Sequence, residues 1–130
     1  MKTGRDYTFY RKACVSGIFY PSSKYLLEKE LDSLFAKVKN IKSDKNTLAV
    51  ISPHAGYIYS GEVATAAFSA IPNDSEFERI FIISSSHRES FEGASVFDDG
   101  DYETPLGTIE VDQEINEELK KFDEFYFSSF

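Results

Sequence analysis

The chain contains two histidines, and each follows a short apolar run. His54 comes three residues after LAVI at 48–51, and His87 comes four residues after RIFII at 79–83. Neutral imidazole is the commonest metal-ligating side chain, and it also serves as an acid or base near neutral pH. Two imidazoles with one carboxylate form the facial site of non-haem Fe(II) enzymes. The two histidines are therefore the first candidates for a metal site or for acid–base catalysis.

The segments around the histidines predict one parallel crossover unit. LAVI is an unbroken apolar run and RIFII is apolar after Arg79. Such runs are typical of strands buried on both faces. Between them, residues 60–71 carry apolar side chains on one helical face and end before Pro72. A strand, a helix and a strand in this order favour a right-handed crossover. Because ligands bind outside the carboxyl edge of a parallel sheet, we expect His54 and His87 to reach one site.

Polar neighbours extend this candidate site. Tyr57 and Ser86 lie within three residues of a histidine, and we expect them to line a pocket. Several carboxylates follow His87 without a spacing diagnostic of metal ligands, namely Glu89, Glu92, Asp98, Asp101 and Glu103. The alternative for each histidine is a structural hydrogen bond to loop backbone. The sequence has no phosphate-binding loop, C-x-x-C, H-E-x-x-H or G-x-S-x-G motif.

The remaining patterns predict the frame of an α/β fold. An amphipathic helix is expected over 23–39, with Ser22 or Ser23 as its N-cap. A short helix should begin after Asp112, which has the side chain of an N-cap. Further along the chain we expect a strand at 93–97, turns at 98–101 and 104–107, a half-exposed strand at 108–111 and a strand-like aromatic tail at 122–130. That tail indicates either a strand buried by another subunit or a fragment of a longer protein.

Length, charge and cysteine content limit the classes of function. The 130 residues suit a single domain over 1–130. A net charge of −8 argues against sequence-independent nucleic-acid binding and against docking on anionic membranes. Cys14 is the single cysteine, so an internal disulfide is excluded and a reducing cytoplasm is expected. No signal-peptide pattern and no membrane-spanning apolar stretch occurs in the sequence.

Four segments in order resemble the Memo family, whose bacterial and archaeal members are called AmmeMemoRadiSam system protein B. These segments are RKACVSGIFYP, SPHAGYIYSG, the second apolar run with SSSH, and YETPLGTIEVD. The resemblance covers residues 11 to 112 and implies a three-layer αβα fold with a largely parallel sheet, related to class III extradiol dioxygenases. It implies that His54 and His87 are ligands of a mononuclear Fe(II) site, with copper as the alternative metal. This chain would then be the N-terminal portion of a Memo-like domain.

The resemblance also implies a function and a set of partners. The function is non-haem metal binding with redox or dioxygenase-like chemistry on a small molecule or peptide at the metal edge. The implied protein partners are the AMMECR-type and radical-SAM proteins of the same system. The chain departs from the family in having SSSH where members have GPSH. Members are also considerably longer, and they carry the third metal-site residue, usually a cysteine, in a C-terminal half; Cys14 does not match that position.

The sequence is also compatible with two other functional interpretations. In the first, the chain is a non-catalytic module whose concave edge binds a peptide, an anion or a partner protein. In the second, it is an inactive fragment that lacks the third metal ligand. An unfinished sheet edge also favours association into a homo-oligomer. The sequence does not decide whether the protein is an enzyme.

Overall fold

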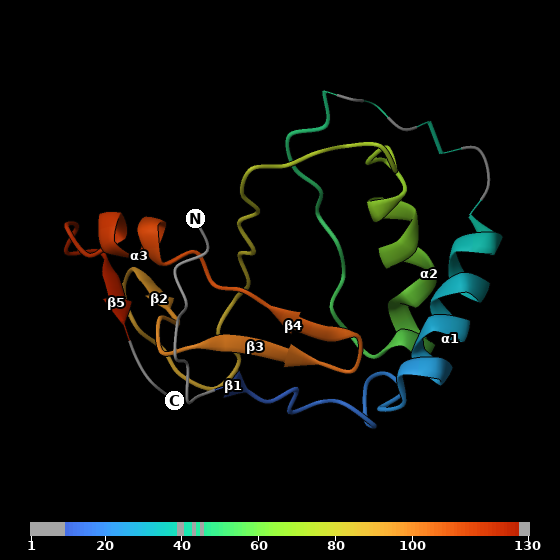
Figure 1. Cartoon of the computed structure of the whole chain (residues 1–130), viewed down its shortest axis with the longest axis horizontal. Coiled ribbons are helices and arrows are strands. Elements are labelled where there is room, and N and C mark those ends of the chain that lie inside the picture. Colours follow the sequence, from blue (N-terminus) through green and yellow to red (C-terminus); the bar gives the residue numbers. More distant parts are fainter. Residues whose placement is uncertain (1–9, 39–40, 43, 45, 128–130) are drawn as a thin grey trace. The chain divides into compact units, whose positions relative to one another are not determined.

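A computed structural model of the chain describes residues 10–38, 41, 42, 44 and 46–127 (Figure 1). The chain divides into two compact units. We call Ala13–Phe77 the helical unit, and Met1–Lys12 with Glu78–Phe130 the sheet unit. Helices and mixed sheets occur together, so the predicted α/β class is confirmed. Among the described residues, no helix is long and apolar enough to cross a membrane.

The helical unit is built on two packed helices, α1 at Lys24–Lys37 and α2 at Tyr57–Phe68. The predicted first helix is confirmed, with Ser23 at its N-cap. Leu27 and Leu34 of α1 are buried. A methyl group added at Gly61 of α2 would lie 2.9 Å from a terminal carbon of Leu34, so the glycine permits the close approach of the helices.

Helix α2 begins earlier than the predicted range of 60–71. Its first amide, that of Tyr57, donates a 2.8 Å hydrogen bond to the Phe19 carbonyl. The amides of Tyr59 and Ser60 donate to the Gly56 carbonyl, so amides of the first turn have acceptors. The spacing of apolar residues could not predict that α2 begins at Tyr57, because the Tyr57 amide donates to Phe19, which lies in a turn far away in the sequence.

The described residues of the sheet unit form two small sheets and one helix. In the first sheet, β1 (Tyr10–Arg11) pairs in parallel with β3 (Asp101–Thr104), which pairs antiparallel with β4 (Gly107–Ile109). In the second, β2 (Ala94–Val96) pairs in parallel with β5 (Phe125–Phe127), and α3 (Gln113–Leu119) precedes β5. The predicted strand at 93–97, the 104–107 turn, the helix after Asp112 and the strand in the aromatic tail are all confirmed.

The core of the sheet unit gathers around Phe97, which is buried. The Arg11 guanidinium lies 5.4 Å from the Phe97 ring centre and 5.6 Å from that of Tyr102. Such distances allow cation–π attraction, which helps to hold β1 on the sheet. Asp101 is also buried, and its carboxylate accepts a 2.9 Å hydrogen bond from the Val111 amide. Strand β1 is therefore held by side chains from the last third of the sequence.

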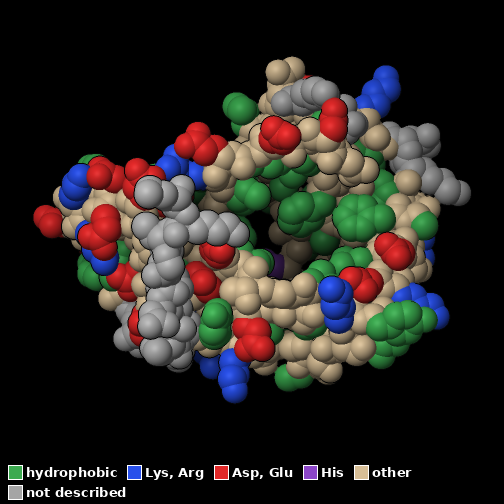
Figure 2. Space-filling model, in the orientation of Figure 1, with side chains coloured by type: hydrophobic (Ala, Val, Ile, Leu, Met, Phe, Trp, Pro, Cys, Tyr) green, Lys and Arg blue, Asp and Glu red, His purple; other side chains and the backbone are tan. Residues whose placement is uncertain are grey.

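The predicted strands at 48–51 and 79–83 are wrong as strands in this structure. Both runs are described, neither belongs to a strand, and most of their apolar side chains are exposed. A strand requires a neighbouring backbone, and an apolar run predicts burial without specifying what covers it. Figure 2 shows hydrophobic side chains at the surface of the visible face. Of the predicted crossover unit, only the helix is therefore formed, over Tyr57–Phe68.

Candidate functional site

His54 is exposed and lies in the segment 52–56, which leads into α2 of the helical unit. The backbone after it is closely held, because Gly56 is buried against the backbone of Phe19. The Ser60 hydroxyl donates a 3.1 Å hydrogen bond to the Ala55 carbonyl. Contacts within one unit therefore position the stretch that carries this histidine.

A cavity of about 380 Å³ lies beside this segment, within the helical unit. Its size falls in the range of small-ligand pockets. His54, Ser52, Tyr57 and Ser60 contribute polar groups to its lining. Apolar and aromatic side chains from the 15–20 turn and from both helices supply most of the remainder. The cavity can accept a small, largely apolar molecule with a few polar contacts.

Tyr57 connects the histidine segment with the turn before α1. Its ring lies 5.6 Å from the ring of Tyr20, centre to centre, in a tilted arrangement. Burial raises the pKa of Tyr57, and the neighbouring Tyr20 and Glu30 raise it further. The Tyr57 hydroxyl is therefore protonated at neutral pH and available as a hydrogen-bond donor.

His87 lies in the exposed stretch 80–95 of the sheet unit. Ser86, the other predicted pocket residue, is exposed, and its hydroxyl accepts a 3.2 Å hydrogen bond from the Glu89 amide. The two histidines thus belong to different units. That both imidazoles reach one common site stays a prediction.

The side chains of the described residues do not by themselves make a metal site. Within this part of the chain, no group of three or more His, Cys, Asp or Glu side chains is arranged to hold an ion. Catalytic zinc sites and non-haem iron facial triads both use three protein ligands. Cys14 is an exposed free thiol of the helical unit. Two imidazoles are therefore only part of the donor set that such a centre needs.

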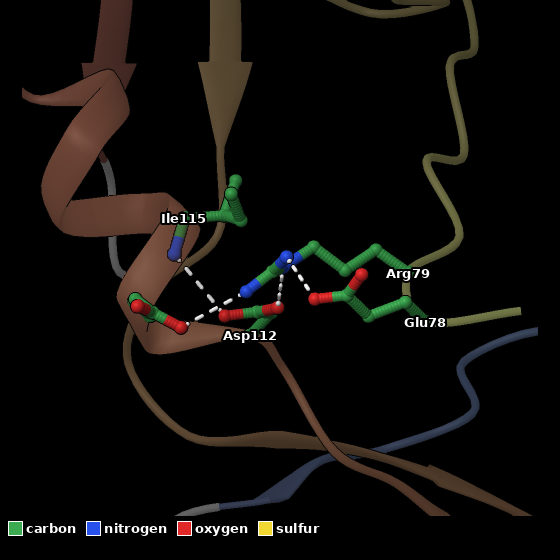
Figure 3. A network of polar contacts seen from close by, with 5 residues as sticks. Glu78, Arg79, Asp112 and Ile115 are labelled. Atoms are coloured by element: carbon green, nitrogen blue, oxygen red, sulfur yellow. Dashed lines mark hydrogen bonds and ion pairs between the residues drawn. The ribbon is translucent and has the colours of Figure 1, made fainter.

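One charged network in the sheet unit had no signal in the sequence (Figure 3). Arg79 forms ion pairs with Asp112 at 2.8 Å, Glu114 at 2.9 Å and Glu78 at 2.8 Å. Asp112 also accepts a hydrogen bond from the Ile115 amide, as an N-cap should. This network ties the first residue of the run 79–83 to the start of α3. The cap could be found from local sequence, but the partner of Asp112 lies 33 positions away.

The network shifts the titration of its central pair. The pKa of Asp112 is lowered, first by the hydrogen bond from the Ile115 amide and then by the Arg79 guanidinium. The pKa of Arg79 is raised, chiefly by its hydrogen bond to Asp112. Both groups are therefore charged across the physiological range, which keeps the tie between the run and α3 intact.

Comparison with known proteins gives a consistent family match. A sequence model of the Memo-like protein family matches residues 11–129. A MEMO1 family protein of Thermoplasma volcanium is 35% identical over 111 residues, which are 85% of this chain and 40% of that relative. MEMO1 family proteins of Nitrosopumilus maritimus and Methanobrevibacter smithii are 34% and 33% identical, over 84% and 92% of this chain. The chain spans less than half the length of these relatives, 41% and 46% for the last two.

Proposed function

Because the chain belongs to the Memo-like family, we propose that it supplies two imidazole ligands, His54 and His87, to one mononuclear metal centre. The observation that carries the proposal is the placement of both histidines of the chain. Each comes three or four residues after an apolar run, and each lies inside the region that the family match covers. The remaining ligands would come from outside the described residues, which contain no group of three possible metal ligands.

The surroundings of the histidines support this role. Both side chains are exposed, so an ion has access to them. The segment around His54 is held by backbone contacts, which lowers the entropy lost when the imidazole binds an ion. Fe(II) is the proposed metal and copper the second candidate, since both accept imidazole ligands. When bound, the metal would supply Lewis-acid or redox chemistry at its open positions.

The cavity beside His54 gives the proposal a place for a small molecule. Its mostly aromatic and aliphatic lining would exclude water from one side of a bound molecule. The protonated Tyr57 hydroxyl would donate a hydrogen bond that orients the molecule. Ser86 would contribute a second hydroxyl beside His87. We propose dioxygenase-like or other redox chemistry for the completed centre, without assigning a substrate.

The wider setting belongs to the same proposal. AMMECR-type and radical-SAM proteins of the AmmeMemoRadiSam system are the proposed protein partners, on the strength of family membership. A reducing cytoplasm is the proposed location, because Cys14 is the single cysteine of the chain and forms no disulfide.

Anaerobic titration with Fe(II) tests the proposal. Equilibrium dialysis of the parent chain, His54→Ala and His87→Ala should show at least about a tenfold loss of affinity in each variant, since even supporting residues of metal sites have effects of this size. Glu28→Gln and Glu117→Gln remove one exposed carboxylate from each unit and control for binding to the acidic surface. Equal Fe(II) affinity in the parent and both histidine variants would overturn the proposal.

A second candidate function is a metal-independent binding module, and the cavity of the helical unit favours it. Such a module would hold an apolar dye, for example anilinonaphthalene sulfonate, equally well with and without a chelator. Dye binding that falls when Phe68→Asp places a charge in the cavity wall would locate the dye there. Metal dependence of the same binding would instead favour the first candidate.

A further inference from the structure

We propose that the runs 48–51 and 80–83 are docking segments for a polypeptide, namely the portion of a Memo-type protein that this chain does not match. In the docked state, backbone of that polypeptide pairs with the two extended runs and its apolar side chains cover theirs. The inference concerns each run separately and requires no particular placement of the two units.

The side chains of the runs are the first observation. Leu48 is 100% exposed and Ile51 is 98% exposed. Ile82 and Ile83 are 85% and 94% exposed. Contiguous exposed apolar surface marks interaction sites in soluble proteins, because burying it releases about 25 cal/mol per Å². Single exposed hydrophobic residues need no explanation, but consecutive ones within a run do.

The backbone of the runs is the second observation. Neither run belongs to a strand in the part of the chain that the structure describes. Backbone that lies outside a strand ladder can pair with an added strand. Successive side chains of a strand point to opposite faces, and both runs are apolar at successive positions. The occupant must therefore cover two faces of each run, which a flat partner surface does not do.

Each run is held at the residue just before it, which prepares the run for docking. The Thr47 hydroxyl donates a 3.2 Å hydrogen bond to the Ala70 carbonyl, just before the first run. Arg79, just before Ile80, is bound by Asp112 and Glu114 at the start of α3. Fixing one end of a segment reduces the conformational entropy lost when the rest becomes ordered in a complex.

The relatives identify the occupant. The matched region accounts for 40% of the Thermoplasma volcanium relative and 46% of the Methanobrevibacter smithii relative. More than half of each relative thus has no counterpart in this chain. In those proteins, that portion belongs to the same polypeptide as the equivalents of the runs, which makes it the natural cover for them. A second copy of this chain is the alternative occupant, and the experiments below separate the two.

The inference rests on the proposed function in one respect, because the same polypeptide would carry the missing metal ligands. Association by apolar burial and strand pairing needs no metal. We therefore measure association in the presence of EDTA, so that a failure of docking and a failure of metal binding are distinguished.

Co-expression provides the first test. The tagged full chain is produced together with the portion of the Thermoplasma volcanium relative that lies outside the matched region, and both are purified in EDTA. We expect a one-to-one complex that Ile82→Asp weakens at least tenfold. Ile58→Asp is the matched control, because Ile58 of α2 is also 85% exposed. No co-purification, or equal loss in both variants, would overturn the inference.

Hydrogen exchange on the unmodified chain provides the second test and does not depend on any variant. Amides of 48–51 and 80–83 should exchange quickly in a monomer verified by light scattering, while those of α1 and α2 exchange slowly. Addition of the partner should protect the two runs. Protection in the monomer would show an internal pairing, and protection that rises with concentration of the chain alone would show a second copy as occupant. Either result would overturn the inference.

Discussion

The helix pair of the helical unit and the two apolar runs place their apolar side chains in opposite environments. Leu34 of α1 is 7% exposed, whereas Leu48 of the first run is fully exposed. The difference lies in where the covering atoms come from. Leu34 is covered by Gly61 and its neighbours on α2, within the same unit. The runs have no such cover among the described residues, so an apolar sequence alone does not produce a buried strand.

This difference bears directly on the two histidines. Each follows one of the exposed runs, so the final position of each imidazole depends on what the runs pair with. The segment of His54 also has the support of α2 and the 15–20 turn. A polypeptide that orders the runs would therefore order the proposed metal ligands at the same time.

Truncating one buried and one exposed leucine tests this difference in environment. Leu34→Ala should lower the free energy of unfolding by about 2–5 kcal/mol, because it opens a cavity between the helices. Leu48→Ala should change it by less than about 0.5 kcal/mol, because an exposed side chain loses little cover. Urea unfolding followed by circular dichroism measures both. Comparable losses in the two variants would show that the first run is buried in solution.

Two glycines with a positive φ differ in the space around them, which is filled at Gly93 and open at Gly107. Gly93 has a φ of +82°, and a methyl group there would overlap the Glu124 carbonyl that accepts the Ala94 amide. Gly107 also has a positive φ, +139°, but nothing lies within 4 Å of an added methyl group. Both alanine variants should lose about 1–3 kcal/mol to backbone strain, and Gly93→Ala should lose more because it also breaks the β2–β5 pairing. Thermal unfolding of both variants measures the two losses of stability. A larger loss for the alanine variant at Gly107 would contradict the predicted ranking.

The smallest expected effect is the acid sensitivity of the tie between Arg79 and α3. The folded-state pKa of Asp112 lies below its ordinary value, so its contribution to stability is present above that ordinary value. The contribution is lost as pH falls through the lowered pKa, below about pH 4. Asp112→Asn should flatten this part of the stability profile.

The control for the acid profile is Asp32→Asn, which changes the same charge on the exposed side of α1. Its profile should keep the acid slope of the parent. Unfolding midpoints measured between about pH 3 and pH 6 test the pair. An unchanged slope in Asp112→Asn would remove Asp112 as a source of acid sensitivity.

Much of the frame could be predicted because its signals are local. The apolar period predicted α1, the TPLG segment predicted the turn between β3 and β4, and Asp112 was recognised as an N-cap. The strands at 48–51 and 79–83 were wrong because strand pairing depends on a distant partner, which an apolar run does not specify.

The candidate site divides in the same way. His54 and His87 could be chosen from residue type and from their place after the runs. The cavity beside His54 could not be predicted, since it depends on the packing of the 15–20 turn against two helices. The ion pairs of Arg79 with Asp112 and Glu114 were also invisible, because these two partners lie more than thirty residues away.

The most direct test of the proposed centre asks whether both imidazoles bind the same ion. Pulsed electron paramagnetic resonance of the chain loaded with one equivalent of Cu(II) counts coordinated imidazoles through their remote nitrogens. We predict two imidazoles on one copper in the parent and one in each of His54→Ala and His87→Ala. A single imidazole in the parent, or a parent spectrum unchanged by either substitution, would contradict a metal centre shared by the two histidines.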